Sequence, residues 1–305
     1  MASTGTIRLQ YRLLNVFATG EEFSGNPLCV FEDGGALTTE GMQRLARQFN
    51  LSETTFILPS ETASAKIRIF TPAYEMPFAG HPTLGTAFVV NDLKSLAGKV
   101  QLQMAAGIIP VASPETGVWR LTANRPRWRE LENNIPELAA ALSLTANDVA
   151  GPVLWVDSGN EQLLVPVNST AAVLRAMPQS EKLAHMGPTF KTLIFYREGD
   201  FVRARFFFRQ LTGFAEDPAT GSACANLGGW FLATKLGSTH AGPPWPRRPH
   251  DIPVFRLPFS CAVSQGTEIG RPSELKLAID ANETITVAGI VRELGRGYVD
   301  VNKRT

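Results

Sequence analysis

The chain has 305 residues, of which 44% are hydrophobic and 19% charged, and this globular composition excludes a largely disordered chain. Twenty-nine Lys and Arg against 28 Asp and Glu leave a net charge of +1, so no basic excess points to a nucleic-acid partner. The length is about twice that of a typical domain and predicts two lobes.

Helices and strands alternate in the first part of the chain. Apolar residues recur at helical spacing over 39–50 and predict an amphipathic helix. Pro82 precedes a long apolar run and occupies the first-turn position that proline prefers, which predicts a second helix. Strands are expected at 7–15, 28–31, 53–58 and 66–71, followed by a meander of strands over 96–123.

A change of composition near 125–130, where proline and charge interrupt the apolar pattern, marks the boundary between the lobes. It places an N-terminal lobe at 1–127, to which a final strand near 290–302 can return, and a C-terminal lobe at 128–289. Strands outnumber helices and arrive in runs, which predicts an α+β protein with mixed or antiparallel sheets. In this second part, helices are expected at 169–177 and 218–235, a proline-rich loop at 238–251, and strands at 153–157, 162–167, 191–197, 202–208, 261–264, 275–280, 284–290 and 298–301.

Three cysteines, Cys29, Cys224 and Cys261, are an odd number without CxxC spacing. Such a set indicates neither a disulfide framework nor a zinc site, and it fits a reducing compartment. The N-terminal residues lack a basic stretch followed by an apolar one, and no apolar stretch reaches about 18 residues, so neither a signal peptide nor a membrane span is expected. We therefore expect a cytoplasmic protein with no membrane partner.

An internal repeat is the most informative feature of the sequence. Residues 78–87 read FAGHPTLGTA and residues 214–223 read FAEDPATGSA, so that five of ten positions are identical and one is a conservative exchange. The separation of 136 residues exceeds the periods of solenoid repeats and indicates a duplicated lobe. Chance similarity between two strand–turn–helix corners is the alternative reading.

Both copies predict the same kind of corner. A proline at the first helical position leaves neighbouring backbone N–H groups free, and these donors with the helix dipole can bind a carboxylate or a phosphate. His81 precedes the proline in one copy and Asp217 in the other. Different polar groups at equivalent positions would face one cleft from opposite sides. This would suit an active site that needs a different acid–base group on each side of its ligand.

Five segments carry a resemblance to a known family: FSGNPLCVF (23–31), LARQFNLSETTFIL (45–58), IRIFTPAYEMPFAGHPTLGTA (67–87), FAEDPATGSA (214–223) and QGTEIGRPS (265–273). Through them the chain resembles the PhzF-like family of phenazine-biosynthesis isomerases, within the diaminopimelate epimerase-like fold. The resemblance implies two pseudo-symmetric α+β lobes, each a sheet curled around a central helix, with the active site between them. It also implies a homodimer that needs no cofactor.

The family's phenazine enzyme moves a proton between ring carbons of a dihydro-hydroxyanthranilate. Each catalytic candidate also has a purely structural reading: a carboxylate at the end of an element, a buried hydrogen-bonded histidine, or an aspartate N-cap. The resemblance assigns catalysis to Glu53, His81 and Asp217, and substrate binding to Asn26, Gly80, Gly221 and Ser222.

One departure from the wider superfamily reduces the number of reactions to consider. Racemases of this fold use two cysteines, one from each lobe. Here the first corner has no cysteine, Thr220 stands where the second cysteine is expected, and Cys224 lies a turn into the helix. A two-thiol racemase is therefore disfavoured. No nucleotide-binding, zinc-protease or serine-hydrolase motif occurs, and the four histidines have no metal-ligand spacing. We expect a cofactor-independent isomerase that moves a proton on a small carboxylate-bearing metabolite. The alternatives are a non-catalytic small-molecule binding protein on the same fold and a racemase.

Overall fold

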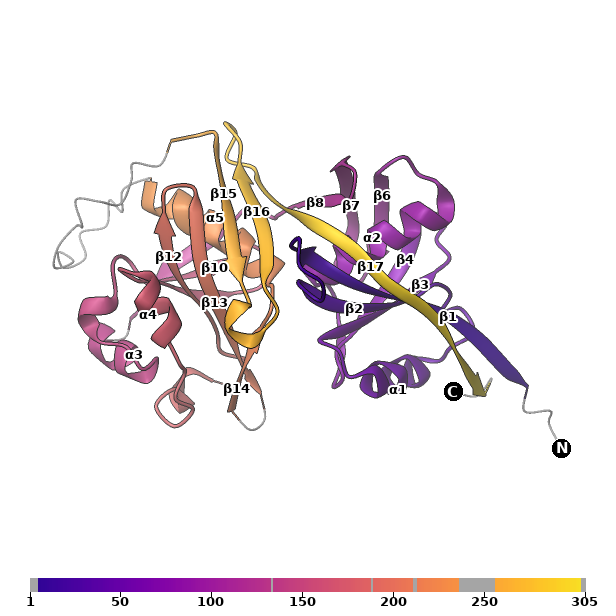
Figure 1. The fold of residues 1–305 in the computed structure, drawn as a ribbon, viewed down its shortest axis with the longest axis horizontal. Coiled ribbons are helices and arrows are strands. Elements are labelled where there is room, and N and C mark those ends of the chain that lie inside the picture. The colour runs from indigo at the N-terminus through magenta and orange to yellow at the C-terminus, as the bar shows by residue number, and fades with distance from the viewer. Residues whose placement is uncertain (1–4, 133, 188, 211–212, 236–255, 303–305) are drawn as a thin grey trace. The chain divides into compact units, whose positions relative to one another are not determined.

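The computed structural model describes residues 5–132, 134–187, 189–210, 213–235 and 256–302 (Figure 1). The chain forms two compact units, Met1–Thr122 with Ala288–Thr305 and Ala123–Val287. We call them unit 1 and unit 2 and describe each by itself. The proline-rich stretch 238–251 lies outside the described residues.

Unit 1 is a mixed sheet with one parallel connection through each of its two helices. β2 and β3 are parallel and joined by α1, and β4 and β6 are parallel and joined by α2. The pairs β1–β2, β3–β4, β4–β5, β6–β7 and β7–β8 are antiparallel. The elements are β1 (Thr6–Ala18), β2 (Asn26–Phe31), α1 (Thr39–Phe49), β3 (Glu53–Leu58), β4 (Ala65–Phe70), β5 (Glu75–Met76), α2 (Gly80–Lys94), β6 (Lys99–Met104), β7 (Gly107–Glu115) and β8 (Val118–Thr122).

Helix α2 is the centre of unit 1. It is buried continuously over 80–87, as expected for a helix without a polar face, and it contacts β1, β2, β3, β4, β6, β7 and β8. The sheet approaches it closely, because a Cβ on Gly85 would lie 2.5 Å from Leu28 Cδ2 and 3.0 Å from Val16 Cγ2. The predicted α+β class, with a mixed sheet curled around a central helix, is confirmed.

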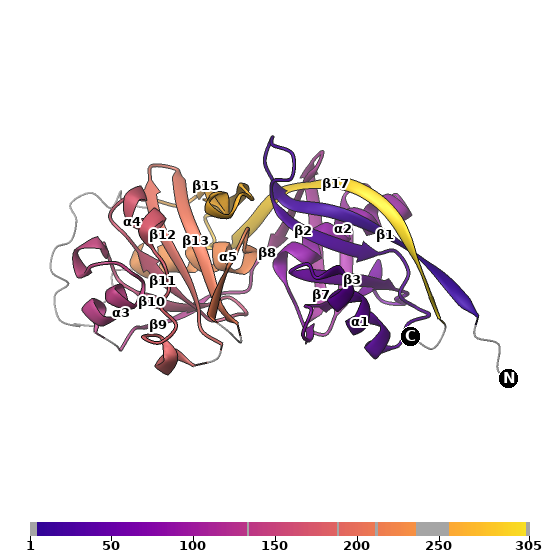
Figure 2. The ribbon, with the colours of Figure 1, turned by 60° about the horizontal axis from the view of Figure 1, so that its bottom comes forward.

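The last strand, β17 (Ile285–Asn302), closes unit 1 by pairing with the first. β1 and β17 are antiparallel from Thr6↔Asn302 to Ala18↔Ile290, and Figure 2 shows them side by side. The sequence predicted two strands here, at 284–290 and 298–301, and this was wrong. Glycines interrupt the apolar pattern, but Gly297 fits within a continuous strand because a Cβ there would lie 2.5 Å from the Tyr11 hydroxyl oxygen.

Unit 2 repeats the topology of unit 1. β11 and β12 are parallel and joined by α4, and β13 and β15 are parallel and joined by α5, which contacts β9, β10, β11 and β16. β9–β10, β10–β11, β12–β13, β13–β14 and β15–β16 are antiparallel, so that β9 takes the place that β17 has beside β1. The elements are β9 (Arg127–Glu130), α3 (Ile135–Ala141), β10 (Leu154–Asp157), β11 (Gln162–Pro166), α4 (Thr170–Arg175), β12 (Lys191–Glu198), β13 (Phe201–Gln210), β14 (Gly213–Asp217), α5 (Gly221–Lys235), β15 (Phe259–Gln265) and β16 (Ser273–Ile279), with short 3₁₀ turns at Ala146–Asp148, Ala184–Met186 and Thr267–Ile269.

The two corners predicted from the repeat differ at the start of their helices. α2 begins at Gly80, after the extended N-cap Ala79, so Pro82 is its third residue. α5 begins at Gly221, three residues after Pro218. The expectation of a proline at the first helical position was therefore wrong in both copies. The N–H groups of the whole first turn lack intrahelical acceptors, so proline is tolerated at the third residue as well as the first.

Among the described residues, no helix has the length and apolar character needed to cross a bilayer.

Candidate active site

Glu53 and His81 face each other in unit 1. Glu53 is the first residue of β3 and His81 the second residue of α2. His81 Nε2 lies 3.4 Å from Glu53 Oε2, and the two side chains are 6% and 15% exposed. The structure thus brings together two of the three predicted catalytic residues, which are 28 positions apart in the sequence.

Burial determines the protonation of this pair. It lowers the pKa of His81 from 6.5 to about 3, against the opposing effect of a hydrogen bond to the backbone of Pro27. Proline has no N–H, so its carbonyl must accept that bond from the imidazole. The imidazole is therefore neutral near pH 7, with its N–H toward Pro27 and the lone pair of Nε2 toward Glu53.

One proton between Nε2 and Oε2 removes the repulsion between their lone pairs. When the Glu53 carboxylate takes up a proton, the lone pair of His81 Nε2 can accept a hydrogen bond from it. The pair can then hold a transferable proton at a defined atom, Glu53 Oε2. This is the chemistry that a general acid or base requires.

The two predicted binding residues of unit 1 lie beside this pair in the fold. Asn26 begins β2 and is fully buried, and its Oδ1 accepts a hydrogen bond of 3.2 Å from Ser52 Oγ, next to Glu53. Gly80 is the buried first residue of α2. Its backbone N–H belongs to the first turn, whose donors are directed out of the helix end.

Asp217 lies in unit 2 as the last residue of β14, followed by a short corner that leads to α5. Thr220 Oγ1 donates a hydrogen bond to Asp217 Oδ2. The corner is also held by Gln265, whose Nε2 donates to the Asp217 carbonyl oxygen at 2.7 Å. Asp217 is thus a corner residue after a strand, four positions before the first residue of α5.

Gly221 and Ser222 are the first two residues of α5. Ser222 Oγ accepts a hydrogen bond of 2.9 Å from Gln162 Nε2, so its own hydrogen can be donated to a ligand. Gln162 Oε1 in turn accepts a 2.9 Å bond from Asn226 Nδ2. Both amides are fully buried, and they fix the serine hydroxyl at the helix start.

The sequence reasoning missed the residues that hold the site. Gln162 and Asn226 lie in segments that the sequence predicted only as a strand and a helix, without a functional motif. Gln265 belongs to QGTEIGRPS (265–273), which contributed to the resemblance without a role, and its deep burial as a polar residue (1% exposed) is visible only in the structure.

Cys29, Cys224 and Cys261 are buried and form no disulfide, and burial raises the pKa of each thiol. Such thiols are poor nucleophiles and poor bases near neutral pH. Within the described part of the chain, no three His, Cys, Asp or Glu side chains gather as ligands for a metal ion.

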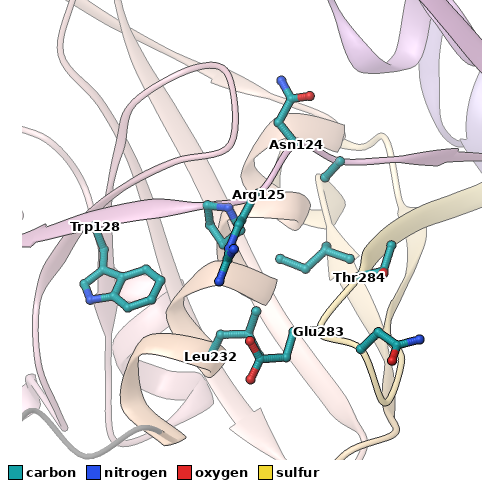
Figure 3. A pocket seen from close by; sticks show the side chains of 10 residues that line it. Asn124, Arg125, Trp128, Leu232, Glu283 and Thr284 are labelled. Carbon is teal, nitrogen blue, oxygen red and sulfur yellow. The ribbon is translucent and has the colours of Figure 1, made fainter.

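A pocket of about 340 Å³ lies elsewhere in unit 2 (Figure 3). Arg125, Trp128 and Glu283 line it, together with Leu232 near the end of α5. None of the predicted site residues is among its lining residues. The candidate site therefore rests on the Glu53–His81 pair of unit 1 and on the Asp217 corner of unit 2, and none of these three residues lines the pocket.

Comparison with known proteins identifies the family of this chain. The family described as phenazine biosynthesis-like protein matches residues 14–291. An uncharacterised isomerase of Pasteurella multocida is 36% identical over 95% of this chain and 94% of its own length. The trans-2,3-dihydro-3-hydroxyanthranilate isomerase of Pseudomonas aeruginosa is 33% identical over 87% of this chain and 88% of its own.

The fold agrees as well. The crystal structure of a PhzF-family phenazine biosynthesis protein from Bacillus anthracis superposes with a TM-score of 0.79 at 25% identity, covering 96% of this chain and 99% of that one. Family, fold and enzyme class, as expected from the sequence, are confirmed. The chain belongs to the phenazine biosynthesis-like family and is an enzyme of the isomerase class.

Proposed function

We propose that the protein moves a proton between two carbons of a small carboxylate-bearing metabolite by general acid–base catalysis, without a cofactor. The observation that supports this most is the buried Glu53–His81 pair, with 3.4 Å between Oε2 and Nε2. The Glu53 carboxylate can take up a proton and release it again, and the neutral imidazole beside it can accept a hydrogen bond from the protonated form.

In the proposed reaction, the Glu53 carboxylate takes a proton from one substrate carbon. The electrons of that C–H bond shift into the adjacent unsaturated system, and a proton is delivered to a second carbon, so that the substrate gains and loses one proton. The neutral His81 accepts a hydrogen bond from the protonated Glu53 and so stabilises the acid form. Asp217 is proposed as the second acid–base group.

The substrate carboxylate is proposed to bind to backbone N–H donors at the helix starts, at Gly80 or at Gly221 and Ser222. These positions lie in a first helical turn, whose N–H groups lack intrahelical acceptors, at the positive end of a helix dipole. The hydroxyl of Ser222, which accepts from Gln162, adds a donor at the start of α5. The relatives named trans-2,3-dihydro-3-hydroxyanthranilate isomerases make a cyclic amino acid of this type the first compound to test.

The test is to incubate the protein with trans-2,3-dihydro-3-hydroxyanthranilate in D₂O, following isomerisation by ultraviolet absorbance and deuterium incorporation by mass spectrometry. Glu53→Gln keeps the shape of the side chain but cannot exchange a proton. We expect turnover to fall by about 10²–10⁴-fold, with calorimetric ligand affinity retained.

The control is Glu61→Gln, the same exchange at an exposed position of unit 1, which should keep wild-type turnover. Wild-type turnover in Glu53→Gln would remove this residue from the mechanism. Binding of the compound by the wild type without turnover or deuterium incorporation would favour the non-catalytic alternative.

A further inference from the structure

Gln265 makes three hydrogen bonds to the corner that carries Asp217. Its Nε2 donates to the Asp217 carbonyl oxygen at 2.7 Å and to Thr220 Oγ1 at 3.1 Å. Its Oε1 accepts from the Thr220 backbone N–H at 3.3 Å. Gln265 ends β15, 45 residues after Thr220, so the amide joins two distant segments of unit 2.

The partners of this amide leave no choice about its orientation. A carbonyl oxygen can only accept and a backbone N–H can only donate, so the nitrogen must face Asp217 O and the oxygen must face Thr220 N. The second hydrogen of Nε2 is then directed at Thr220 Oγ1. Reversing the amide would place an acceptor against the carbonyl oxygen and a donor against the N–H group.

This orientation determines the direction of the next hydrogen bond. The Thr220 hydroxyl has one hydrogen, and its oxygen already accepts from Gln265. The hydrogen must therefore be donated to the remaining partner, Asp217 Oδ2. Asp217 Oδ2 is an acceptor in this arrangement, and a proton on that oxygen would meet the hydrogen of Thr220.

The backbone beside Gln265 is shaped to fit the same corner. Gly266 has a left-handed φ of +79°, and a Cβ there would overlap the carbonyl oxygens of Pro218 and Arg271. The backbone oxygen of Gly266 accepts from Arg271 N at 2.9 Å, which closes the turn that leads to β16. Side chain and backbone of this Gln–Gly pair thus both pack on the corner.

We propose that Gln265 is a positioning residue, which turns the Thr220 hydroxyl toward Asp217 and so fixes Oδ2 of this carboxylate as a hydrogen-bond acceptor. A proton on Oδ2 would oppose the hydrogen of Thr220, so this oxygen stays unprotonated while the contact is formed. The proposal rests on the proposed function, in which Asp217 is an acid–base group. The alternative is that Gln265 and Thr220 only stabilise the fold.

A double-mutant cycle separates these readings. Thr220→Val removes the hydroxyl at nearly constant volume, and we expect kcat to fall by about 10- to 100-fold, as for losing a hydrogen bond to a charged group. Thr220→Ser, which keeps the hydroxyl, should recover most of this loss. In the Asp217→Asn background, Thr220→Val should change kcat by less than about twofold, because the group through which it acts is already altered.

The matched control is Thr192→Val on β12. Thr192 Oγ1 is buried in the same unit and has no hydrogen-bond partner among the described residues, so the same exchange should not lower kcat. Gln265→Met should resemble Thr220→Val in kcat and in its dependence on Asp217. If Thr220→Val and Gln265→Met cost as much in Asp217→Asn as in the wild type, or if Thr220→Ser fails to recover kcat, the positioning role is refuted.

A second readout needs no substrate. In Gln265→Met the Thr220 N–H loses its acceptor, so hydrogen exchange at this amide should accelerate by at least about tenfold relative to other amides of α5. Unchanged exchange in a folded variant would contradict the proposed contact. Wild-type turnover in Asp217→Asn would instead refute the catalytic assignment of Asp217, whatever the exchange measurement shows.

Discussion

The neutral state of His81 makes a quantitative prediction about stability. Burial lowers the pKa of His81 from 6.5 in the unfolded chain to about 3. Between these values the unfolded chain binds a proton that the folded protein excludes, so folding is opposed as the pH falls. The contribution is fully present above about pH 6.5 and is lost progressively toward pH 3.

The magnitude follows from the linkage relation. Within this window one proton of difference changes the free energy of unfolding by about 1.4 kcal/mol per pH unit. From pH 6.5 to pH 5, His81 should therefore lower stability by about 2 kcal/mol. The groups that face the imidazole are the Pro27 carbonyl and Glu53. An ionised Glu53 would stabilise the imidazolium and reduce the effect.

The assay is urea unfolding at about pH 7, 6 and 5, comparing wild type with His81→Asn. Asparagine can still donate to the Pro27 carbonyl but does not titrate. Wild type should lose about 2 kcal/mol more than the variant over this range, and Glu53→Gln should lose at least as much as wild type. The other three histidines remain in both proteins and cancel in the comparison. Parallel pH dependences of wild type and His81→Asn would refute the buried neutral imidazole.

Three further substitutions test the fold and the site. Gly85→Ala should lower the free energy of unfolding by about 1–3 kcal/mol, because its Cβ would lie 2.5 Å from Leu28 Cδ2. The control is Gly20→Ala, whose Cβ would have no described atom within 4 Å. Equal stabilities of the two variants in urea would contradict the close packing of α2. Gly221→Val should weaken calorimetric binding of a carboxylate ligand more than it weakens folding, because bulk at the helix start blocks access to the backbone donors; equal losses would make Gly221 a packing residue. Cys224→Ala should leave turnover within about threefold, because its thiol is buried and its pKa raised, whereas abolished turnover would revive a thiol mechanism.

The elements that the sequence predicted well are those whose pattern is local. β3 runs over Glu53–Leu58 as expected, and α1 over Thr39–Phe49 differs from its prediction by one residue. β9 (Arg127–Glu130) was not foreseen, because all four of its residues are exposed and charged or aromatic. Its strand conformation depends on pairing with β10, and such a partner cannot be identified from four residues alone.

The site was predictable only in part. The internal repeat singled out His81 and Asp217, and the resemblance added Glu53 and assigned catalysis to all three; these roles remain predictions. The start of α5 was misplaced because Pro218 suggested a helix, whereas the Gln265 amide holds 217–220 as a separate corner. Two of the three partners of that amide are backbone groups, which every residue type has, so no pattern of side chains in the sequence could reveal the contact.

The pairing of β1 with β17 has a consequence for synthesis on the ribosome. Unit 1 begins with the first strand and is completed by the last, from Ala288 onward, while all of unit 2 is encoded between them. Unit 2 can therefore fold during translation, whereas β1 can pair with β2 early but with β17 only after β17 has been synthesised. A nascent chain stopped at Val287 would have an intact unit 2 and an open sheet edge along β1, whose partner residues in β17 lie 272 to 296 positions away in sequence.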